Sequence, residues 1–163
     1  MSYTDKIIQS RKRLGELIST IARPLVFTNG CFDILHVGHV DYLNRSAQLG
    51  NFLLVAVNSD ESVRRLEKGV SRPYNTLDER MQVLAALACV DCVVPFDEDT
   101  PINLIKLVNP DHLVKGGDWE KKNMVGKEYV REQGGQLHSL PFSYPNSTTK
   151  LISKIQKTNN IIN

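Results

Sequence analysis

Residues 25–57 read LVFTNGCFDILHVGHVDYLNRSAQLGNFLLVAV, and this stretch decides the fold. Two short apolar runs, at 25–28 and 52–57, have the pattern of strands that are buried on both faces of a sheet. Residues 38–49 between them have the pattern of a helix, and Gly50 follows where a helix commonly ends. We therefore predict a strand, a helix and a second strand that runs parallel to the first.

The same alternation continues through the rest of the chain. We predict further strands at 92–95, 112–115 and 136–140, and further helices at 60–66, 77–88, 102–108, 125–133 and 148–155. The sequence TLDE at 76–79 has the pattern of a capping box, which marks a helix start. The alternation predicts an α/β fold, in which a parallel sheet carries helices on both faces. Ligands of such sheets bind beyond the carboxyl ends of the strands, so we expect the loops that follow the strands to carry the function.

The length and composition fit one globular domain. The chain has 163 residues, of which 41% are hydrophobic, and a formal net charge of +2. This charge is too small to indicate nucleic-acid binding, and no apolar run of about 18 residues predicts a membrane span. Three cysteines without a secretory signal suggest reduced thiols and a cytoplasmic protein. Cys89 and Cys92 lack the second ligand pair of a zinc site, so we interpret them as small residues beside a strand, with a redox pair as the alternative.

The two ends of the chain are expected to lie outside the domain proper, which we place at 24–156. Residues 1–23 are predicted to form a helix that packs on the domain, because apolar residues recur there at roughly helical spacing. A transit peptide is the alternative, but Asp5 and Glu16 argue against it because such peptides contain few acids. Residues 157–163 are polar and are predicted to form a frayed tail.

Two histidines mark the start of the first predicted helix. If the helix begins near Gly38, His39 lies in its first turn and His36 in the loop that precedes it. The free N–H groups and the positive end of the helix dipole favour anions there, and Gly38 lets a phosphate approach the backbone closely. Two imidazoles can also donate hydrogen bonds to phosphate oxygens, which suits the charge that builds up on a phosphate under attack.

Three other interpretations of this motif stay open. The histidines could simply cap the helix, which is the commonest case for an arbitrary H-x-x-H. They could bind a metal, but the H-E-x-x-H spacing of zinc peptidases is absent, and we predict no protein metal site. The loop at Asn29 and Gly30 could also bind a dinucleotide, but the pattern G-x-G-x-x-G is absent.

The segment NGCFDILHVGHVDYL at 29–43 resembles the T/N-G-x-F-D-x-x-H-x-G-H signature of the nucleotidyltransferase superfamily that includes cytidylyltransferases and pantetheine-phosphate adenylyltransferase. Four further segments resemble the D-glycero-β-D-manno-heptose 1-phosphate adenylyltransferases: VAVNSDESVRRLEKGVSRPYNTLDERMQVLAAL, EDTP, PDHLVKGGDW and NSTTKLISKI. The similarity extends from about residue 24 to residue 155. It implies a Rossmann-like nucleotidyltransferase fold with about five parallel strands in the order 3-2-1-4-5.

The resemblance implies that AMP is transferred from ATP to D-glycero-β-D-manno-heptose 1-phosphate, giving ADP-heptose and pyrophosphate for lipopolysaccharide core synthesis. It also implies Mg²⁺ bound with the ATP substrate, and a homodimer as in related enzymes. In many relatives this domain is fused behind a ribokinase-type sugar kinase. No such kinase is present in this sequence, so a stand-alone enzyme fed by a separate sugar kinase is expected.

Roles for individual residues follow from the same resemblance. Catalysis is assigned to His36, His39, Lys115 and Arg72, which would hold the phosphates and stabilise the transition state. Nucleotide binding is assigned to Thr28, Asn29, Gly30, Phe32, His39, Gly116, Asp118, Ser147, Thr148 and Thr149. Substrate binding is assigned to Asp33, Asn58, Asp60, Arg72 and Trp119.

Several of these roles keep alternatives. Asp33 could orient its loop or contact substrate, and Trp119 could pack structurally or border the sugar. The hydroxyl residues at 147–149 could simply cap the last helix. Arg80 could be a surface residue or could reach back to the phosphates. Lys115 ends the fourth predicted strand, and we expect it to lie opposite the first strand, across the point where the strand order reverses.

Two other functions stay open. One is a cytidylyltransferase that acts on glycerol 3-phosphate or a similar small phosphate, because the motif and the length fit both reactions. The other is a non-catalytic regulatory module that binds a nucleotide, which would be expected to have a damaged phosphate site. Both histidines, Lys115, Arg72 and the S-T-T segment are present, and this argues against the regulatory module.

Overall fold

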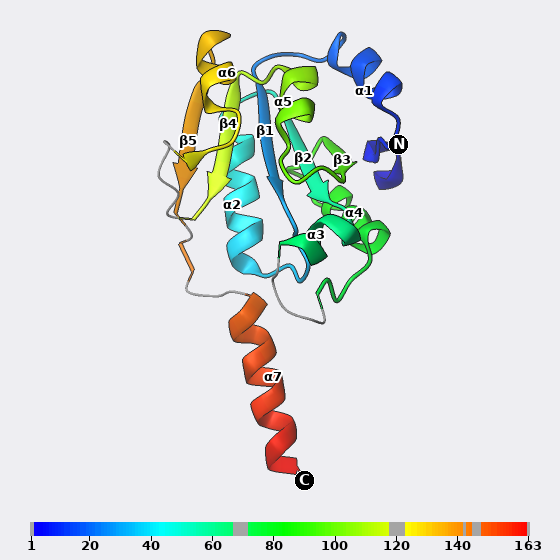
Figure 1. Cartoon of the computed structure of the whole chain (residues 1–163), viewed down its shortest axis with the longest axis vertical. Helices are drawn as coiled ribbons and strands as arrows, with labels where there is room; N and C mark the ends of the chain where they lie inside the picture. The colour runs from blue at the N-terminus through cyan, green and yellow to red at the C-terminus, as the bar shows by residue number, and fades with distance from the viewer. Residues whose placement is uncertain (1, 67–71, 118–122, 142, 145–147, 163) are drawn as a thin grey trace.

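The computed structural model describes residues 2–66, 72–117, 123–141, 143–144 and 148–162 (Figure 1). Its centre is one five-stranded parallel sheet in the order β3-β2-β1-β4-β5. The strands are β1 (Leu25–Gly30), β2 (Phe52–Asn58), β3 (Cys92–Phe96), β4 (His112–Gly116) and β5 (Gln136–Leu140). This arrangement confirms the predicted parallel sheet and its strand order. The order reverses between β1 and β4, which are neighbours in the sheet although β2 and β3 lie between them in the chain.

Helices cover both faces of the sheet (Figure 1). The helices are α1 (Arg11–Ile18), α2 (Val37–Ala47), α3 (Asp60–Arg65), α4 (Leu77–Ala85), α5 (Ile102–Val108), α6 (Lys127–Glu132) and α7 (Thr148–Ile162). Adjacent strand residues point to opposite faces, so that Phe27 packs with α5 and α6, and Val26 packs with α2 and α4. The two buried clusters thus place a hydrophobic layer on each side of the strands, as the continuous apolar runs predict.

Two helix boundaries have clear local causes. Thr76 and Glu79 form the predicted capping box at the start of α4, in which each side chain accepts a hydrogen bond from the backbone N–H of the other residue. Gly50 does not directly follow the end of α2, which ends at Ala47. A side chain at Gly50 would clash with the backbone carbonyl of Pro24, so the glycine is required by this close approach of two chain segments.

The N-terminal segment differs from the predicted single helix. Ile7 pairs in parallel with Val93 of β3, and the backbone N–H of Ile8 donates to the carbonyl of Val93 at 2.9 Å. A 3-10 turn, η1 (Tyr3–Lys6), precedes this pairing, and Ser10 caps α1, which begins only at Arg11. The prediction of helix at Ile7 and Ile8 was wrong, because these residues meet their backbone hydrogen-bonding and burial needs at the edge of the sheet.

The C-terminal helix is longer than predicted. It was expected to end at residue 155, with an irregular tail from 157, but α7 continues to Ile162. Neither glycine nor proline occurs between Thr148 and Ile162 to stop the helix. Figure 1 shows that α7 projects away from the sheet and its covering helices. Among the residues described, no helix combines the length and the apolar character needed to cross a membrane.

Candidate active site

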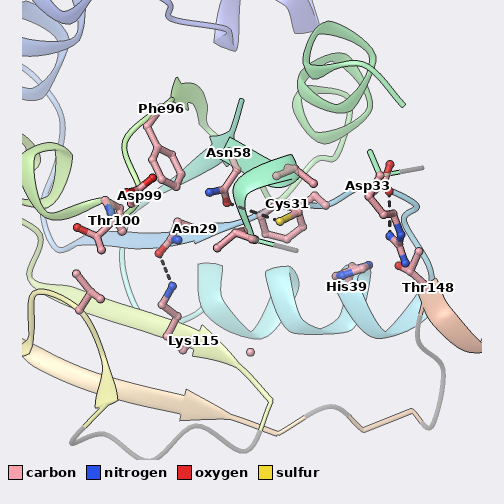
Figure 2. A pocket seen from close by; sticks show the side chains of 18 of the residues that line it. Asn29, Cys31, Asp33, His39, Asn58, Phe96, Asp99, Thr100, Lys115 and Thr148 are labelled. Atoms are coloured by element: carbon pink, nitrogen blue, oxygen red, sulfur yellow. Dashed lines mark hydrogen bonds and ion pairs between the residues drawn. The ribbon is translucent and has the colours of Figure 1, made fainter. Parts of the chain in front are cut away.

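A cavity of about 690 Å³ opens where the strand order reverses (Figure 2). It lies beyond the carboxyl ends of β1, β2 and β4, and the start of α7 closes one side. Of the residues predicted for the site, those that line it are Asn29, Gly30, Phe32, Asp33, His39, Asn58, Arg72, Lys115, Gly116, Thr148 and Thr149. Asp118, Trp119 and Ser147 lie outside the described residues. Segments that are far apart in the sequence therefore meet around one cavity.

The histidine pair stands at the start of α2. His36 is the residue that caps the helix, and its Nδ1 accepts a hydrogen bond from the backbone N–H of Gly38 at 3.2 Å. Because Nδ1 is an acceptor here, the proton of the neutral ring is on Nε2. The ring of His39 lies 4.0 Å from that of His36 between centroids, and His39 lines the cavity. Within this one motif, His36 thus caps the helix and His39 lies beside the cavity.

The two imidazoles are held in their neutral form. Burial and, to a smaller extent, the charge of the neighbouring His36 lower the pKa of His39 to about 4. Burial also lowers the pKa of His36. At neutral pH, these rings can therefore donate hydrogen bonds to an anion without carrying a permanent positive charge.

The β1–α2 loop (residues 31–36) is shaped by Gly30 and Phe32. Phe32 has a left-handed backbone with φ of 48°, which is uncommon for a residue other than glycine. Its ring lies against Gly30, where an added Cβ would come 3.1 Å from a ring carbon, and it packs edge-on against His39 with 5.6 Å between the centroids. The absence of a side chain at Gly30 thus leaves room for Phe32, which supports the His39 ring from behind.

Lys115 lines the cavity beside Asn29 (Figure 2). It is the second-last residue of β4, and its ammonium group donates a hydrogen bond to the side-chain oxygen of Asn29 at the end of β1. Since β1 and β4 are the two strands at the point of reversal, this contact crosses the mouth between them. The site therefore has a positive charge where two strands part and ligands commonly bind.

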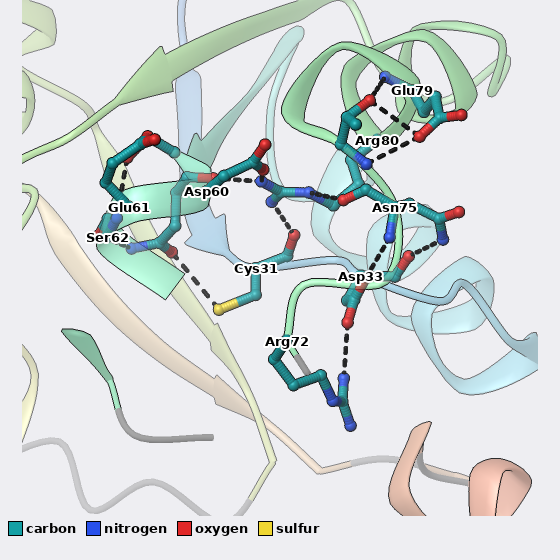
Figure 3. A network of polar contacts seen from close by, with 12 residues as sticks. Cys31, Asp33, Asp60, Glu61, Ser62, Arg72, Asn75, Glu79 and Arg80 are labelled. Carbon is teal, nitrogen blue, oxygen red and sulfur yellow. Dashed lines mark hydrogen bonds and ion pairs between the residues drawn. The ribbon is translucent and has the colours of Figure 1, made fainter. Parts of the chain in front are cut away.

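Asp33 holds a neighbouring segment in place (Figure 3). One carboxylate oxygen accepts the backbone N–H groups of Tyr74 at 2.8 Å and Asn75 at 3.0 Å, and the other accepts from Arg72 at 2.9 Å. The side chain of Asp33 is only 2% exposed. Of the two roles left open by the sequence, these contacts support the orienting one, and Asp33 also lines the cavity. Arg72 lines the cavity, and the ion pair fixes its position.

Arg80 is buried behind the loop (Figure 3). Its guanidinium donates to the carbonyl groups of Cys31, Asn58 and Asn75 and to the carboxylate of Asp60, with the last contact at 2.8 Å. Neither alternative from the sequence, a surface position or a reach to the phosphates, is correct. Asp60 is not among the residues that line the cavity, and its carboxylate accepts from Arg80.

A sequence signal for the burial of Arg80 existed. The apolar residues Met81 and Leu84 define the buried face of α4, and Arg80 lies four positions before Leu84 on that face. A charged residue within such a stripe requires several polar partners. This reasoning indicates a structural arginine and needs no knowledge of the fold.

Two further predicted residues have mainly structural contacts. Thr28 is fully buried, and its hydroxyl bonds with that of Tyr42, so its side chain is not available to a nucleotide. Thr148 lines the cavity and donates to the carbonyl of Ile34 at 3.2 Å, which ties the start of α7 to the β1–α2 loop. The side chain of Thr28 thus belongs to the core, and its predicted role in nucleotide binding depends on its backbone groups. Thr148 both lines the site and joins two of its walls.

The prediction missed one wall of the cavity. This wall consists of Phe96 at the end of β3 and of Asp99, Thr100 and Pro101 in the loop that leads to α5, together with Val63, Leu66 and Val125. The signal was present, because the rule that loops after parallel strands carry function applies to β3 as well. Within the described ranges, no three His, Cys, Asp or Glu side chains gather into a group that could hold a metal ion.

The geometry can be compared with that of known proteins. The cytidylyltransferase-like family model matches residues 27–154. D-beta-D-heptose 1-phosphate adenylyltransferase of Bordetella bronchiseptica is 52% identical over 148 residues, which cover 88% of this chain and 91% of that protein. The bifunctional protein HldE of Helicobacter hepaticus is 47% identical over 96% of this chain, but this chain spans only 32% of it.

A solved structure shows the same fold. The lipopolysaccharide core biosynthesis protein from Thermoplasma volcanium superposes with a TM-score of 0.60 at 27% sequence identity, over 75% of this chain and 98% of that one. The family match includes the histidine pair, Lys115 and Thr148. Of these, His39, Lys115 and Thr148 line the cavity, and the ring of His36 lies against that of His39. With its sheet order, its site and these matches, the chain belongs to the cytidylyltransferase-like family of nucleotidyltransferases.

Proposed function

We propose that this protein transfers AMP from ATP to D-glycero-β-D-manno-heptose 1-phosphate and releases pyrophosphate. The observation that carries the proposal is the 52% identity to a D-beta-D-heptose 1-phosphate adenylyltransferase over most of both chains. The cavity supports it, because its basic groups and a helix start converge where a polyphosphate needs hydrogen-bond donors. The product, ADP-heptose, would be an activated sugar for the lipopolysaccharide core.

The triphosphate of ATP is proposed to lie at the start of α2. There, His39 and the positive end of the helix dipole would face its oxygens, with His36 supporting the His39 ring. Lys115 and Arg72 would neutralise phosphate charge from the opposite walls. Gly116 and the start of α7 would border the nucleoside.

The reaction requires no covalent enzyme intermediate. A phosphate oxygen of the sugar 1-phosphate attacks the α-phosphorus of ATP and forms the new P–O bond. The bond from the α-phosphorus to the oxygen that bridges to the β-phosphorus breaks, and pyrophosphate leaves with that oxygen and its electron pair. An ionised phosphate is already a nucleophile, so the residues act by positioning and by stabilising the growing charge.

We place Mg²⁺ on the phosphates of ATP as part of the substrate, since Mg²⁺ is commonly held by substrate phosphates and waters.

The proposal includes the setting in which the enzyme works. We propose a cytoplasmic location, a homodimer and a separate sugar kinase that supplies the heptose 1-phosphate. No membrane or nucleic acid takes part in the proposed reaction.

Pyrophosphate release with four substrate pairs tests the proposal. ATP or CTP is combined with heptose 1-phosphate or glycerol 3-phosphate, and we expect rapid turnover with ATP and heptose 1-phosphate alone. Turnover only with CTP would replace the proposal with a cytidylyltransferase. Tight ATP binding without turnover of any pair would indicate a regulatory module.

A further inference from the structure

The cavity has two chemically different ends (Figure 2). His39 and Thr148 lie at one end, whereas Phe96, Asp99 and Thr100 lie together at the other, and Lys115 lies with Asn29 on the side of this second group. The basic residues among the described lining are His39, Arg72 and Lys115, and none of them comes from the loop after β3. We call the part lined by this loop, by the end of α3 and by Asn58 the far end of the cavity.

The far end combines apolar walls with hydrogen-bond acceptors. Phe96 and Val63 are buried and form an apolar floor, and Leu66 is 42% exposed at the rim. The polar groups there are the carboxylate of Asp99, the hydroxyl of Thr100 and the amide of Asn58. A polyol with apolar C–H faces and several O–H donors fits this combination, because carboxylate oxygens only accept hydrogen bonds.

Arg65 holds the carboxylate of Asp99 in position, and the carboxylate can still accept further hydrogen bonds. The Nε of Arg65 donates to one of its oxygens at 2.9 Å, and the same arginine also pairs with Asp97. The charge of Arg65 is therefore shared between two carboxylates, and Arg65 does not line the cavity. An ionised carboxylate offers about four lone-pair directions, so Asp99 can accept sugar hydroxyls as well.

The charge difference between the two ends gives the sugar phosphate a direction. A phosphate placed beside Asp99 would be repelled, whereas the same group near Lys115 and Arg72 would be attracted. The hydroxyl-bearing part of the molecule would then extend toward Asp99 and Thr100. This orientation directs the phosphate oxygen toward the end where His39 lies.

We infer that the far end is the subsite for the sugar hydroxyls, and that Asp99 and Thr100 are specificity-determining residues that select a polyhydroxylated phosphate as acceptor. The inference rests on the proposed function and adds the residues that recognise the acceptor. A small acceptor such as glycerol 3-phosphate has too few hydroxyls to engage these residues together with the apolar floor.

Steady-state kinetics with ATP and heptose 1-phosphate test the inference. We expect Asp99→Asn to raise the KM for heptose 1-phosphate roughly 10- to 100-fold, as for the loss of a charged hydrogen-bond acceptor, and to leave the KM for ATP unchanged. We expect Thr100→Val to raise the sugar KM by roughly 3- to 10-fold, as for a neutral hydrogen bond. Both residues are exposed, so the variants should keep the fold, which circular dichroism verifies.

The matched control is Glu61→Gln. Glu61 also forms an exposed ion pair with an arginine, Arg64, but it does not line the cavity, so this variant should retain both KM values. A rise in the KM for ATP with an unchanged sugar KM would place the nucleoside at the far end and overturn the inference. If the wild type forms ADP-heptose and both variants keep its sugar KM, the inference alone is overturned. If the wild type forms no ADP-heptose, the proposed function fails and the inference fails with it.

Discussion

Two sets of basic side chains flank the β1–α2 loop, and the protein uses them in opposite ways. In front of the loop, His39, Lys115 and Arg72 line the cavity. Behind it, Arg80 has no exposed side-chain surface and binds three carbonyl groups and Asp60 (Figure 3). The comparison teaches that the position of a basic side chain decides its use near a phosphate site. A basic group in front of the loop can contact ligands, and one behind it fixes the backbone that the ligands meet.

The rear set should matter most for stability. We expect Arg80→Met to lower the free energy of unfolding by about 3–5 kcal/mol, because a buried ion pair is broken and several carbonyl groups lose their donor. Denaturant unfolding of wild type and variant measures this difference. The control is Arg64→Met, which removes an exposed arginine from a surface ion pair and should cost at most about 1 kcal/mol. Equal losses for the two variants would show that the buried network has no special role.

The front set should matter most for turnover. We expect His39→Ala to lower kcat by roughly 10²- to 10³-fold, equivalent to about 2.7–4 kcal/mol, because one donor to the developing charge is lost. The thermal unfolding midpoint should change little compared with the effect of Arg80→Met. Val40→Ala, at the next and more exposed position of α2, is the control that should keep the rate. A near-normal kcat for His39→Ala would contradict its place in the front set.

The same comparison explains what the sequence could predict. The strands were predicted within about two residues, and for β1 and β2 the reason is that each is a short apolar run that ends in polar residues, which local pattern is enough to identify. The pairing of Ile7 with Val93 joins positions far apart in the chain, and local periodicity contains no information about it. A helix was therefore predicted where an extended segment lies at the sheet edge.

For the site, the sequence predicted which loops reach the cavity better than it predicted which way their side chains point. The rule for parallel sheets placed the loops correctly, so Asn29, Asn58 and Lys115 do meet around the cavity. It could not tell whether a side chain after a strand faces the cavity or the interior. That choice is made for Asp60 by Arg80 and for Asp33 by the segment that begins at Arg72, and both partners come from later in the chain.

Arg72 of the front set is held by its ion pair with Asp33, and a double-mutant cycle measures how strongly the two residues depend on each other. We expect Asp33→Asn and Arg72→Ala each to lower kcat/KM, and the double variant to lose less than the sum, with a coupling of about 1–2 kcal/mol. The reason is that Asp33 is proposed to act through Arg72, which has no role to lose once its anchor is gone. The same cycle between Arg72→Ala and Glu61→Gln should be additive. Additivity for Asp33 and Arg72 would mean that Asp33 acts on the site by another route.

The smallest expected effect concerns pH. Because burial lowers the pKa of His39 in the folded protein to about 4, against about 6.5 in the unfolded chain, the unfolded state binds more protons between these values. The contribution of His39 to stability is therefore complete above pH 6.5 and is lost as the pH falls toward 4. From pH 7 to pH 5.5, this loss amounts to about 1 kcal/mol of the free energy of unfolding. Denaturant unfolding at the two pH values should show a smaller loss for His39→Ala than for the wild type, whereas Val40→Ala should match the wild type. If His39→Ala lost as much stability as the wild type, the imidazole would not be held neutral by its burial, and the front set would already carry a positive histidine before any phosphate binds.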